Sequence, residues 1–222
     1  MLRAVFAFLA LLLAAVASDP AAAEGRGRPG DFDLWVLSLS WSPSFCEATG
    51  RARGDLQCAR PFAFVVHGLW PQYQRGWPSD CDTRAAPPSR AQVSDMLDIM
   101  PSPGLIAHEW RKHGTCSGLS GESYLRVIRK LFETIHIPDE FRDTREPRMV
   151  STREVERAFI AANKGLDGDE ISVQCDSRRL QEVRICLKKD LSAFVSCGET
   201  DRRACRLDRV YMPAVRGGAP RP

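Results

Sequence analysis

The stretch FDLWVLSLSW, residues 32–41, alternates between two kinds of side chain along its length. Two tryptophans and two leucines occupy the odd positions from 35 to 41, whereas Val36, Ser38 and Ser40 occupy the even positions. Successive side chains of a β-strand point to opposite faces, so this pattern predicts a half-buried strand. Pro43 follows directly and is expected to end the strand.

Further strand-like and helix-like segments follow this one along the chain. Strands are predicted at residues 61–66 (PFAFVV), 171–175, 183–188 and 192–197, and helical spacing of apolar residues predicts helices at 89–100, 104–113, 123–134 and 152–163. Ser102 and Pro103 are the expected N-cap and first residue of the second helix, Gly114 is its expected stop, and Gly165 ends the fourth. Strands mixed with consecutive helices predict an α+β fold, a single domain with a central antiparallel sheet flanked by helices.

The two ends of the chain differ in composition from the part between them. Residues 1–23 start with a basic residue, continue apolar through residue 17 and finish in three alanines, which is typical of a signal peptide cleaved after Ala23 or, alternatively, after Ala17. The apolar run is shorter than the roughly 20 residues that span a membrane. We therefore expect a secreted or periplasmic protein without a membrane anchor, with a domain at 24–212, a disordered tail at 213–222 and a monomeric state.

The net charge of +3 tolerates a polyanionic partner but does not require one. The chain has eight cysteines, and all of them follow the predicted signal peptide. An even number of cysteines in an exported protein predicts four disulfides, although the pattern alone leaves many pairings open. They are Cys46, Cys58, Cys81, Cys116, Cys175, Cys186, Cys197 and Cys205.

Four histidines, at positions 67, 108, 113 and 136, are the best candidates for proton transfer near neutral pH. His67 directly follows the second predicted strand and precedes a glycine, a place where a rigid strand supports a functional loop. Taken alone, a histidine at a strand end is more often structural. His136, which follows an apolar helix, is expected to be structural too.

The segment HEWRKH, residues 108–113, concentrates five ionisable side chains in six positions. At about 100° per residue in a helix, four of them share one face that is roughly 140° wide, and the other two residues of the segment point elsewhere. These four are His108, Glu109, Lys112 and His113. A solvated helix with an i,i+4 Glu–His pair would show the same spacing, so the segment alone leaves a surface role open.

A metal site on this helix is disfavoured by its spacing. His108 and His113 are five residues apart, whereas a metalloprotease helix places its two histidines four apart. Lys112 would also repel a cation bound there. No cysteine pair has zinc-ligand spacing, and no glycine-rich phosphate loop is present. We therefore expect no metal and no cofactor.

The segments FVVHGLWPQ, residues 64–72, and HEWRKHGTC, residues 108–116, together resemble the two active-site segments of the ribonuclease T2 family. These are exported acid ribonucleases of bacteria, fungi, plants and animals, and the pattern is most similar to the bacterial members. Residues 32–46 resemble the opening strand of the family, and the similarity continues to about residue 207.

This resemblance implies an endoribonuclease that cleaves single-stranded RNA, with low base specificity, through a 2′,3′-cyclic phosphate and without a metal. His113 matches the general base that takes the 2′-hydroxyl proton, and His67 matches the general acid that protonates the leaving 5′-oxygen. Glu109 and Lys112 match the pair that stabilises the pentacoordinate phosphorane. The attacking and leaving oxygens lie on opposite sides of phosphorus, so the reaction needs one base and one acid that flank it.

Three further residues are implied to bind substrate. His108 matches the phosphate-binding histidine, and its charged form predicts activity at mildly acidic pH. Trp70 matches an aromatic residue that stacks on a base, and Gln72 lies beside it in the same segment. Trp77, in the loop that follows, is expected either to touch a base or to pack.

The resemblance also implies how the cysteines pair. The implied disulfides are Cys46–Cys58, Cys81–Cys116, Cys175–Cys205 and Cys186–Cys197. The second of these would tie the loop after one active-site segment to the end of the other. Two other functions remain open at this point, a catalytically inactive RNA-binding or signalling protein on the same fold and a metal-dependent phosphodiesterase.

Overall fold

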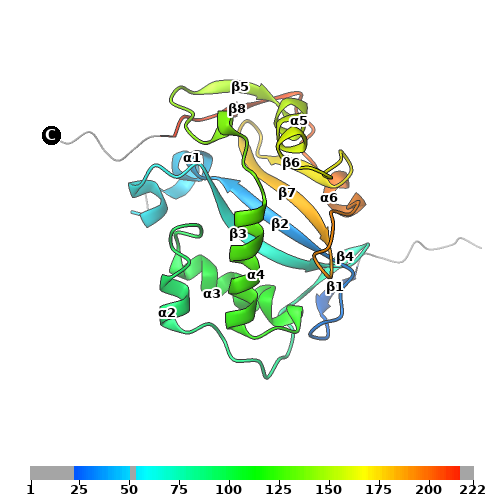
Figure 1. Cartoon of the computed structure of the whole chain (residues 1–222). Helices are drawn as coiled ribbons and strands as arrows, with labels where there is room; N and C mark the ends of the chain where they lie inside the picture. Colours follow the sequence, from blue (N-terminus) through cyan, green and yellow to red (C-terminus); the bar gives the residue numbers. More distant parts are fainter. Residues whose placement is uncertain (1–22, 51–53, 216–222) are drawn as a thin grey trace, which may run out of the picture.

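A four-stranded antiparallel sheet forms the centre of the molecule, with the strand order β3-β2-β7-β6 (Figure 1). The computed structural model describes residues 23–50 and 54–215. The sheet strands are β2 (Leu34–Trp41), β3 (Phe64–Gln72), β6 (Ile171–Cys175) and β7 (Leu180–Lys188). The helices are α1 (Ser42–Phe45), α2 (Arg90–Ser94), α3 (Pro103–Lys112), α4 (Gly121–Thr134), α5 (Thr152–Ala162) and α6 (Gly198–Arg202). The predicted α+β class with a central antiparallel sheet is confirmed.

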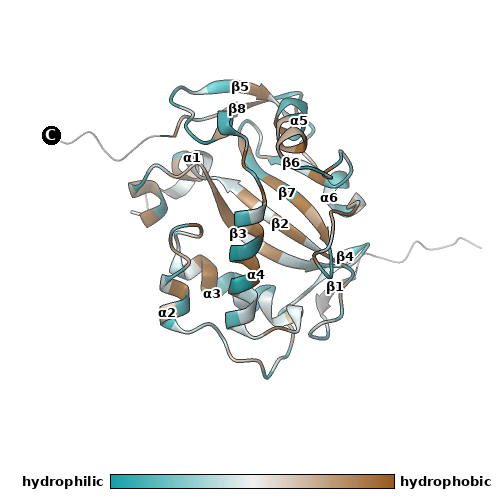
Figure 2. Ribbon diagram, in the orientation of Figure 1, coloured by the Kyte–Doolittle hydropathy of each residue, from teal (hydrophilic) through white to brown (hydrophobic). Residues whose placement is uncertain are grey.

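One face of the sheet packs on the main core, and the other combines polar residues with a small second apolar cluster at Leu34, Val36 and Cys186. The odd-numbered residues 35–41 of β2 lie in the main core, together with apolar residues of α3, α4 and α5. The opposite face carries Ser38 and Ser40 of β2 and Glu182 and Arg184 of β7, which pair across the two strands. Figure 2 shows the apolar residues concentrated along the strands. A strand is therefore confirmed, at Leu34–Trp41, but the predicted half-burial is wrong. As an inner strand of the sheet, β2 is buried on both faces, and of its residues only Ser40 is partly exposed.

Two small sheets were not predicted. In the first, β1 (Ala23–Arg26) pairs in parallel with β4 (Gly76–Ser79). In the second, β5 (Arg148–Ser151) pairs in antiparallel fashion with β8 (Arg209–Met212). Each strand has only four residues, which is too short for an alternating pattern to be recognised in the sequence.

Serine caps begin four of the described helices at or close to the predicted positions, and Ser89 caps α2 with a capping box that includes Gln92. Ser102 accepts a hydrogen bond from the Leu105 N–H at the start of α3, as predicted. Ser120 caps α4, which begins two residues earlier than predicted. Ser151 caps α5 with a capping box that includes Glu154, and α5 ends at Ala162, before the predicted stop at Gly165.

The helix predicted at residues 89–100 is helical only in its first half, at α2 (Arg90–Ser94). Pro101 disfavours helical backbone at the residue before it. The Ile99 carbonyl instead accepts a hydrogen bond from the Val66 N–H at 2.8 Å, which lays this segment along β3. The strand predicted at residues 192–197 is likewise reduced to a single bridge between Phe194 and Leu187.

The structure contains the four disulfides that the family resemblance implied, Cys46–Cys58, Cys81–Cys116, Cys175–Cys205 and Cys186–Cys197. The predicted disordered tail is wrong at its start. The Pro213 carbonyl accepts a hydrogen bond from the Trp41 indole at 3.0 Å, and the Val215 N–H donates to the Thr144 carbonyl at 2.7 Å. Residues 216–222 lie outside the described residues, as do residues 1–22 of the predicted signal peptide. Within the described ranges, no helix has the length and apolar character needed to cross a membrane.

Candidate active site

His67 occupies a β-bulge in β3. Leu39 of β2 pairs with Val66, and the preceding residue, Ser38, pairs with Gly68, so that His67 is the extra residue between two regular pairs. A bulge shifts the alternation of a strand by one residue and often redirects a side chain at an active site. Val66 and Leu69 therefore both enter the core, whereas His67 and Trp70 both face the polar side of the sheet. His67 lies within the strand, not at its end as predicted.

Helix α3 lies beside β3, which is an edge strand, and brings the second group of residues to the same side. Trp110 points into the core, while Arg111 is exposed. The four residues that the helical spacing placed on one face all line one cleft, which has a volume of about 270 Å³. Trp70 and Gln72 line it as well, and so does His67. The structure thus brings together all seven residues that the sequence singled out.

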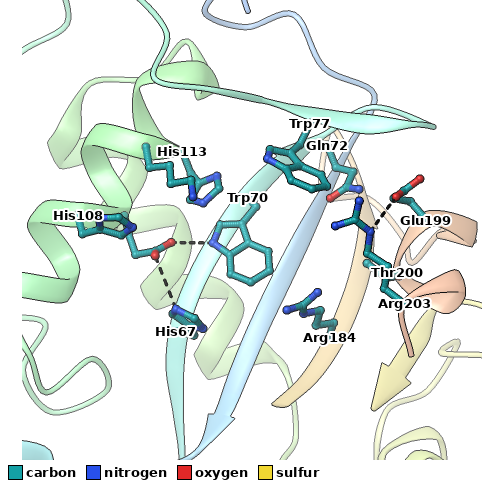
Figure 3. A pocket seen from close by; sticks show the side chains of 12 residues that line it. His67, Trp70, Gln72, Trp77, His108, His113, Arg184, Glu199, Thr200 and Arg203 are labelled. Carbon is teal, nitrogen blue, oxygen red and sulfur yellow. Dashed lines mark hydrogen bonds and ion pairs between the residues drawn. The ribbon is translucent and has the colours of Figure 1, made fainter. Parts of the chain in front are cut away.

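Glu109 connects the two segments. Its Oε2 accepts a hydrogen bond from the Trp70 indole at 2.6 Å, and its Oε1 lies 3.7 Å from Nε2 of His67. Figure 3 shows both contacts as dashed lines. The Trp70 ring lies 5.4 Å from the ring of His67 and 5.4 Å from that of His113, measured between ring centroids. One indole therefore packs against both imidazoles.

The two histidines have opposite electrostatic surroundings. Burial is the largest influence on His67 and lowers its pKa, but the Glu182 hydrogen bond and the negative charges of Glu182 and Glu109 outweigh burial, so the pKa of His67 is raised. Burial and the nearby positive charge of Lys112 lower the pKa of His113 to about 3. His67 is thereby favoured as a proton donor and His113 as a proton acceptor.

The Nδ1 atom of His113 is buried and has no hydrogen-bond partner among the described residues. Proton exchange with a substrate is therefore left to Nε2 of this ring. Burial, which is the largest influence, raises the pKa of Glu109 against the opposing effects of His67 and the Trp70 hydrogen bond.

Two glycines are required by close packing around the site. A β carbon on Gly68 would lie 2.2 Å from Oε2 of Glu109. A β carbon on Gly114 would lie 2.5 Å from the Trp110 ring. Gly114 was predicted as the stop of this helix, and α3 does end just before it, with His113 as its C-cap; Gly114 then begins a 3-10 turn (Gly114–Ser117). Its role is to let the turn pass close to Trp110.

Other cleft residues were not found from the sequence. Arg184 of β7 lies over the Trp70 ring, 4.9 Å from its centroid. From the region of α6, Arg203 stacks over Trp77 at 4.6 Å. Trp77, for which the sequence left a base contact or packing open, lines the cleft as well, as do Glu199 and Thr200 of α6, which the sequence did not indicate. The only signal for Arg184 was its charge on the polar face of a predicted strand.

The model of the Ribonuclease T2 family matches residues 32–197 of this chain. The chain belongs to the ribonuclease T2 family. A protein named Ribonuclease from Aeromonas hydrophila is 35% identical to this T2 family member over 213 residues, which cover 89% of the chain and 90% of the relative.

Two solved structures share the fold of this T2 family member. The crystal structure of RNase NT in complex with 5′-AMP has a TM-score of 0.60 and 21% identity, and the match covers 83% of this chain and 99% of that one. The self-incompatibility associated SF11-RNase of Nicotiana alata has a TM-score of 0.65 and 17% identity, and the match covers 82% and 100% of the two chains. At these identities the likeness concerns the fold alone.

Proposed function

We propose that this T2 family member is an endoribonuclease that cleaves single-stranded RNA by attack of the ribose 2′-hydroxyl, through a 2′,3′-cyclic phosphate. The observation that carries the proposal is the opposite bias of two histidines in one cleft. A neutral His113 accepts the 2′-hydroxyl proton, and a charged His67 protonates the 5′-oxygen as it leaves. Only a ribose supplies the attacking hydroxyl, so DNA is not a substrate.

The remaining cleft residues fit the charge that develops during this step. The Lys112 ammonium and the His108 imidazole would face the phosphoryl oxygens, which gain negative charge in the transition state. Glu109 accepts a hydrogen bond from Trp70 and lies 3.7 Å from His67, and it is proposed to complete the set of groups around phosphorus. The proposed reaction uses no metal, because proton transfer and charge stabilisation come from side chains.

We propose that bases bind by stacking. Trp70 and Trp77 both line the cleft, and stacking on an aromatic ring tolerates every base. Gln72 lies at the same end of the cleft and offers an amide to a base edge. The related structure of RNase NT holds 5′-AMP, which is consistent with a nucleotide site on this fold. Low base specificity follows from stacking as the main contact.

The proposed location is the periplasm or the outside of the cell. The composition of residues 1–23 and four disulfides, which form in oxidising compartments, support it. The proposed mature protein is a monomer without a membrane anchor. N-terminal sequencing of the exported protein checks the cleavage site.

The test is digestion of polymeric RNA by the wild type, His67→Ala and His113→Ala, each with EDTA present. The exposed His136 lies outside the cleft, so His136→Ala is the matched control. We expect cyclic-phosphate ends from the wild type and the control, and a loss of at least about 100-fold in the two cleft variants. RNA that is bound but never cut would support an inactive RNA-binding protein, and loss of activity in EDTA would support a metal-dependent phosphodiesterase.

A further inference from the structure

Glu182 reaches His67 across the width of one strand. It lies on β7, and β2 separates β7 from the strand that carries His67. The intervening residues of β2 on this face are Ser38 and Ser40, and Ser40 is the direct pairing partner of Glu182. Their small side chains leave room for the carboxylate to pass over β2. The serines at alternate positions of β2 therefore leave the space for this contact.

Both oxygens of the Glu182 carboxylate are engaged. Oε1 is hydrogen-bonded to Nδ1 of His67. Oε2 accepts two hydrogen bonds from Arg184, at 3.0 Å from Nε and 2.8 Å from Nη2. The Glu182 side chain is buried, and the guanidinium that holds it also packs on Trp70. Figure 3 shows Arg184 on the side of the Trp70 indole away from His113.

We propose that Glu182 is a positioning residue for the reaction, which holds a proton on Nδ1 of His67 and presents Nε2 to the substrate, and that Arg184 fixes Glu182 in this role. The inference rests on the proposed function, because it assigns a partner to the proposed general acid. A carboxylate behind an imidazole fixes its tautomer and stabilises its charged form. Nε2 then lies 3.7 Å from Glu109, on the cleft side of the ring.

The neighbours of Glu182 keep its carboxylate negatively charged. Burial is the largest influence and raises its pKa, but the hydrogen bond and charge of His67 together with Arg184 outweigh it and lower the pKa to about 2. The carboxylate therefore does not take the proton from His67. Its negative charge instead helps to keep His67 protonated before substrate arrives.

Both steps of the proposed reaction use the same tautomer of His67, the one with a proton on Nδ1. In the first step the 2′-oxygen bonds to phosphorus as its proton moves to His113, and the bond between phosphorus and the 5′-oxygen breaks. The electron pair of that bond stays on the 5′-oxygen, which takes the Nε2 proton of His67. His67 is then neutral, with its remaining proton on Nδ1 facing Glu182. In the second step the free Nε2 takes a proton from water as the water oxygen bonds to phosphorus. The bond between phosphorus and the 2′-oxygen breaks, and His113 returns its proton to the 2′-oxygen.

The experiment compares Glu182→Gln and Arg184→Met with Glu156→Gln as control. Glu156 is a half-buried carboxylate of α5 that accepts a hydrogen bond from the Val173 N–H at 3.3 Å, outside the cleft. The charged or titratable groups that face His67 are Glu109 and His113 from α3, and Glu182 and Arg184 from β7. An NMR titration of His67 and the pH dependence of kcat/KM are measured for each protein.

For Glu182→Gln we expect a lower pKa of His67, and an alkaline limb of kcat/KM that moves to lower pH by the same amount. With a dinucleotide substrate, kcat at pH 7 should fall by roughly tenfold or more while KM changes little. With uridine 3′-(4-nitrophenyl phosphate) the loss should be much smaller, because nitrophenolate leaves without a proton. Arg184→Met removes a positive charge that lowers the pKa of His67, so this pKa should move upward instead.

These measurements test the role of Glu182 separately from the proposed cleavage of RNA. The inference is overturned if Glu182→Gln leaves the His67 titration unchanged, or if both substrates lose activity equally, since a purely structural role predicts equal losses. A wild type that does not cleave RNA overturns the proposed function, while the NMR titration still decides whether Glu182 sets the charge of His67. The control should resemble the wild type throughout.

Discussion

The buried His113 makes the stability of the protein depend on pH in a way that can be measured. Its side chain is 9% exposed, and burial together with Lys112, His67 and His108 lowers its pKa to about 3. In the unfolded chain a histidine titrates near pH 6.5, at about its reference pKa. Below that pH the unfolded state binds a proton that the folded state does not. The contribution of the neutral His113 to the free energy of unfolding is therefore fully present above about pH 6.5 and is lost as the pH falls toward about 3.

The size of the effect follows from this difference in pKa. Between about pH 6.5 and pH 4 the loss amounts to about 1.4 kcal/mol for each pH unit, which is on the order of 3 kcal/mol in total. That is a large part of the roughly 5–15 kcal/mol that holds a typical domain folded. An effect of this size is well above the error of a denaturant titration.

The assay is urea unfolding of the wild type and His113→Phe at pH 7 and at pH 4, with the disulfides intact. Phenylalanine keeps an aromatic ring against Trp70, whose centroid lies 5.4 Å from that of His113, but it cannot be protonated. Any constant change in packing cancels, because only the difference between the two pH values is used. The free energy of unfolding of the wild type should fall by about 3 kcal/mol more than that of the variant. Equal falls in both proteins would refute the assignment of a neutral, buried His113.

Two further variants test the packing and the disulfide that hold the site residues in place. In Gly68→Ala the new β carbon would lie 2.2 Å from Glu109 Oε2 and 2.4 Å from Trp70 Nε1, so we expect kcat to drop at least about tenfold and stability by roughly 1–3 kcal/mol. A normal kcat would show that the carboxylate does not need this position. Replacing Cys81 and Cys116 together with alanine removes a link across 35 residues, and thermal unfolding should reveal a loss of about 2–5 kcal/mol. An unchanged Tm would contradict the clamping role of that disulfide.

The helical part of the site could be predicted from the sequence because it depends on local geometry. The positions of His108, Glu109, Lys112 and His113 on one face follow from the rotation per residue alone. Ser102 and Pro103 mark where the helix begins, and the structure starts α3 there. No knowledge of distant partners was needed for this prediction, and the same four side chains line the cleft.

The positions of the site residues on strands depend on which strands pair and in what register, and a single sequence does not show this. The bulge at His67 exists only in relation to the register of β2, so the sequence indicated a strand end where the structure has a mid-strand irregularity. Glu182 is 115 residues away from His67 in the chain. Its carboxylate could be placed only after the order of the strands was known. Its sequence signal was weak, because Glu182 directly precedes the strand predicted at residues 183–188, and the structure starts that strand earlier, at Leu180.

The fold thus gives two residues of the same type opposite electrostatic surroundings. His67 faces two carboxylates, whereas His113 is buried near a lysine and two other histidines. In the proposed reaction, the first step leaves each ring in the charge state that its surroundings disfavour, with His67 neutral and His113 protonated. Hydrolysis of the cyclic phosphate returns both rings to their favoured states. The surroundings that favour the starting charge states therefore also favour the second step, which restores those states. The difference between the two histidines arises from burial and nearby charge, because their side chains are chemically identical.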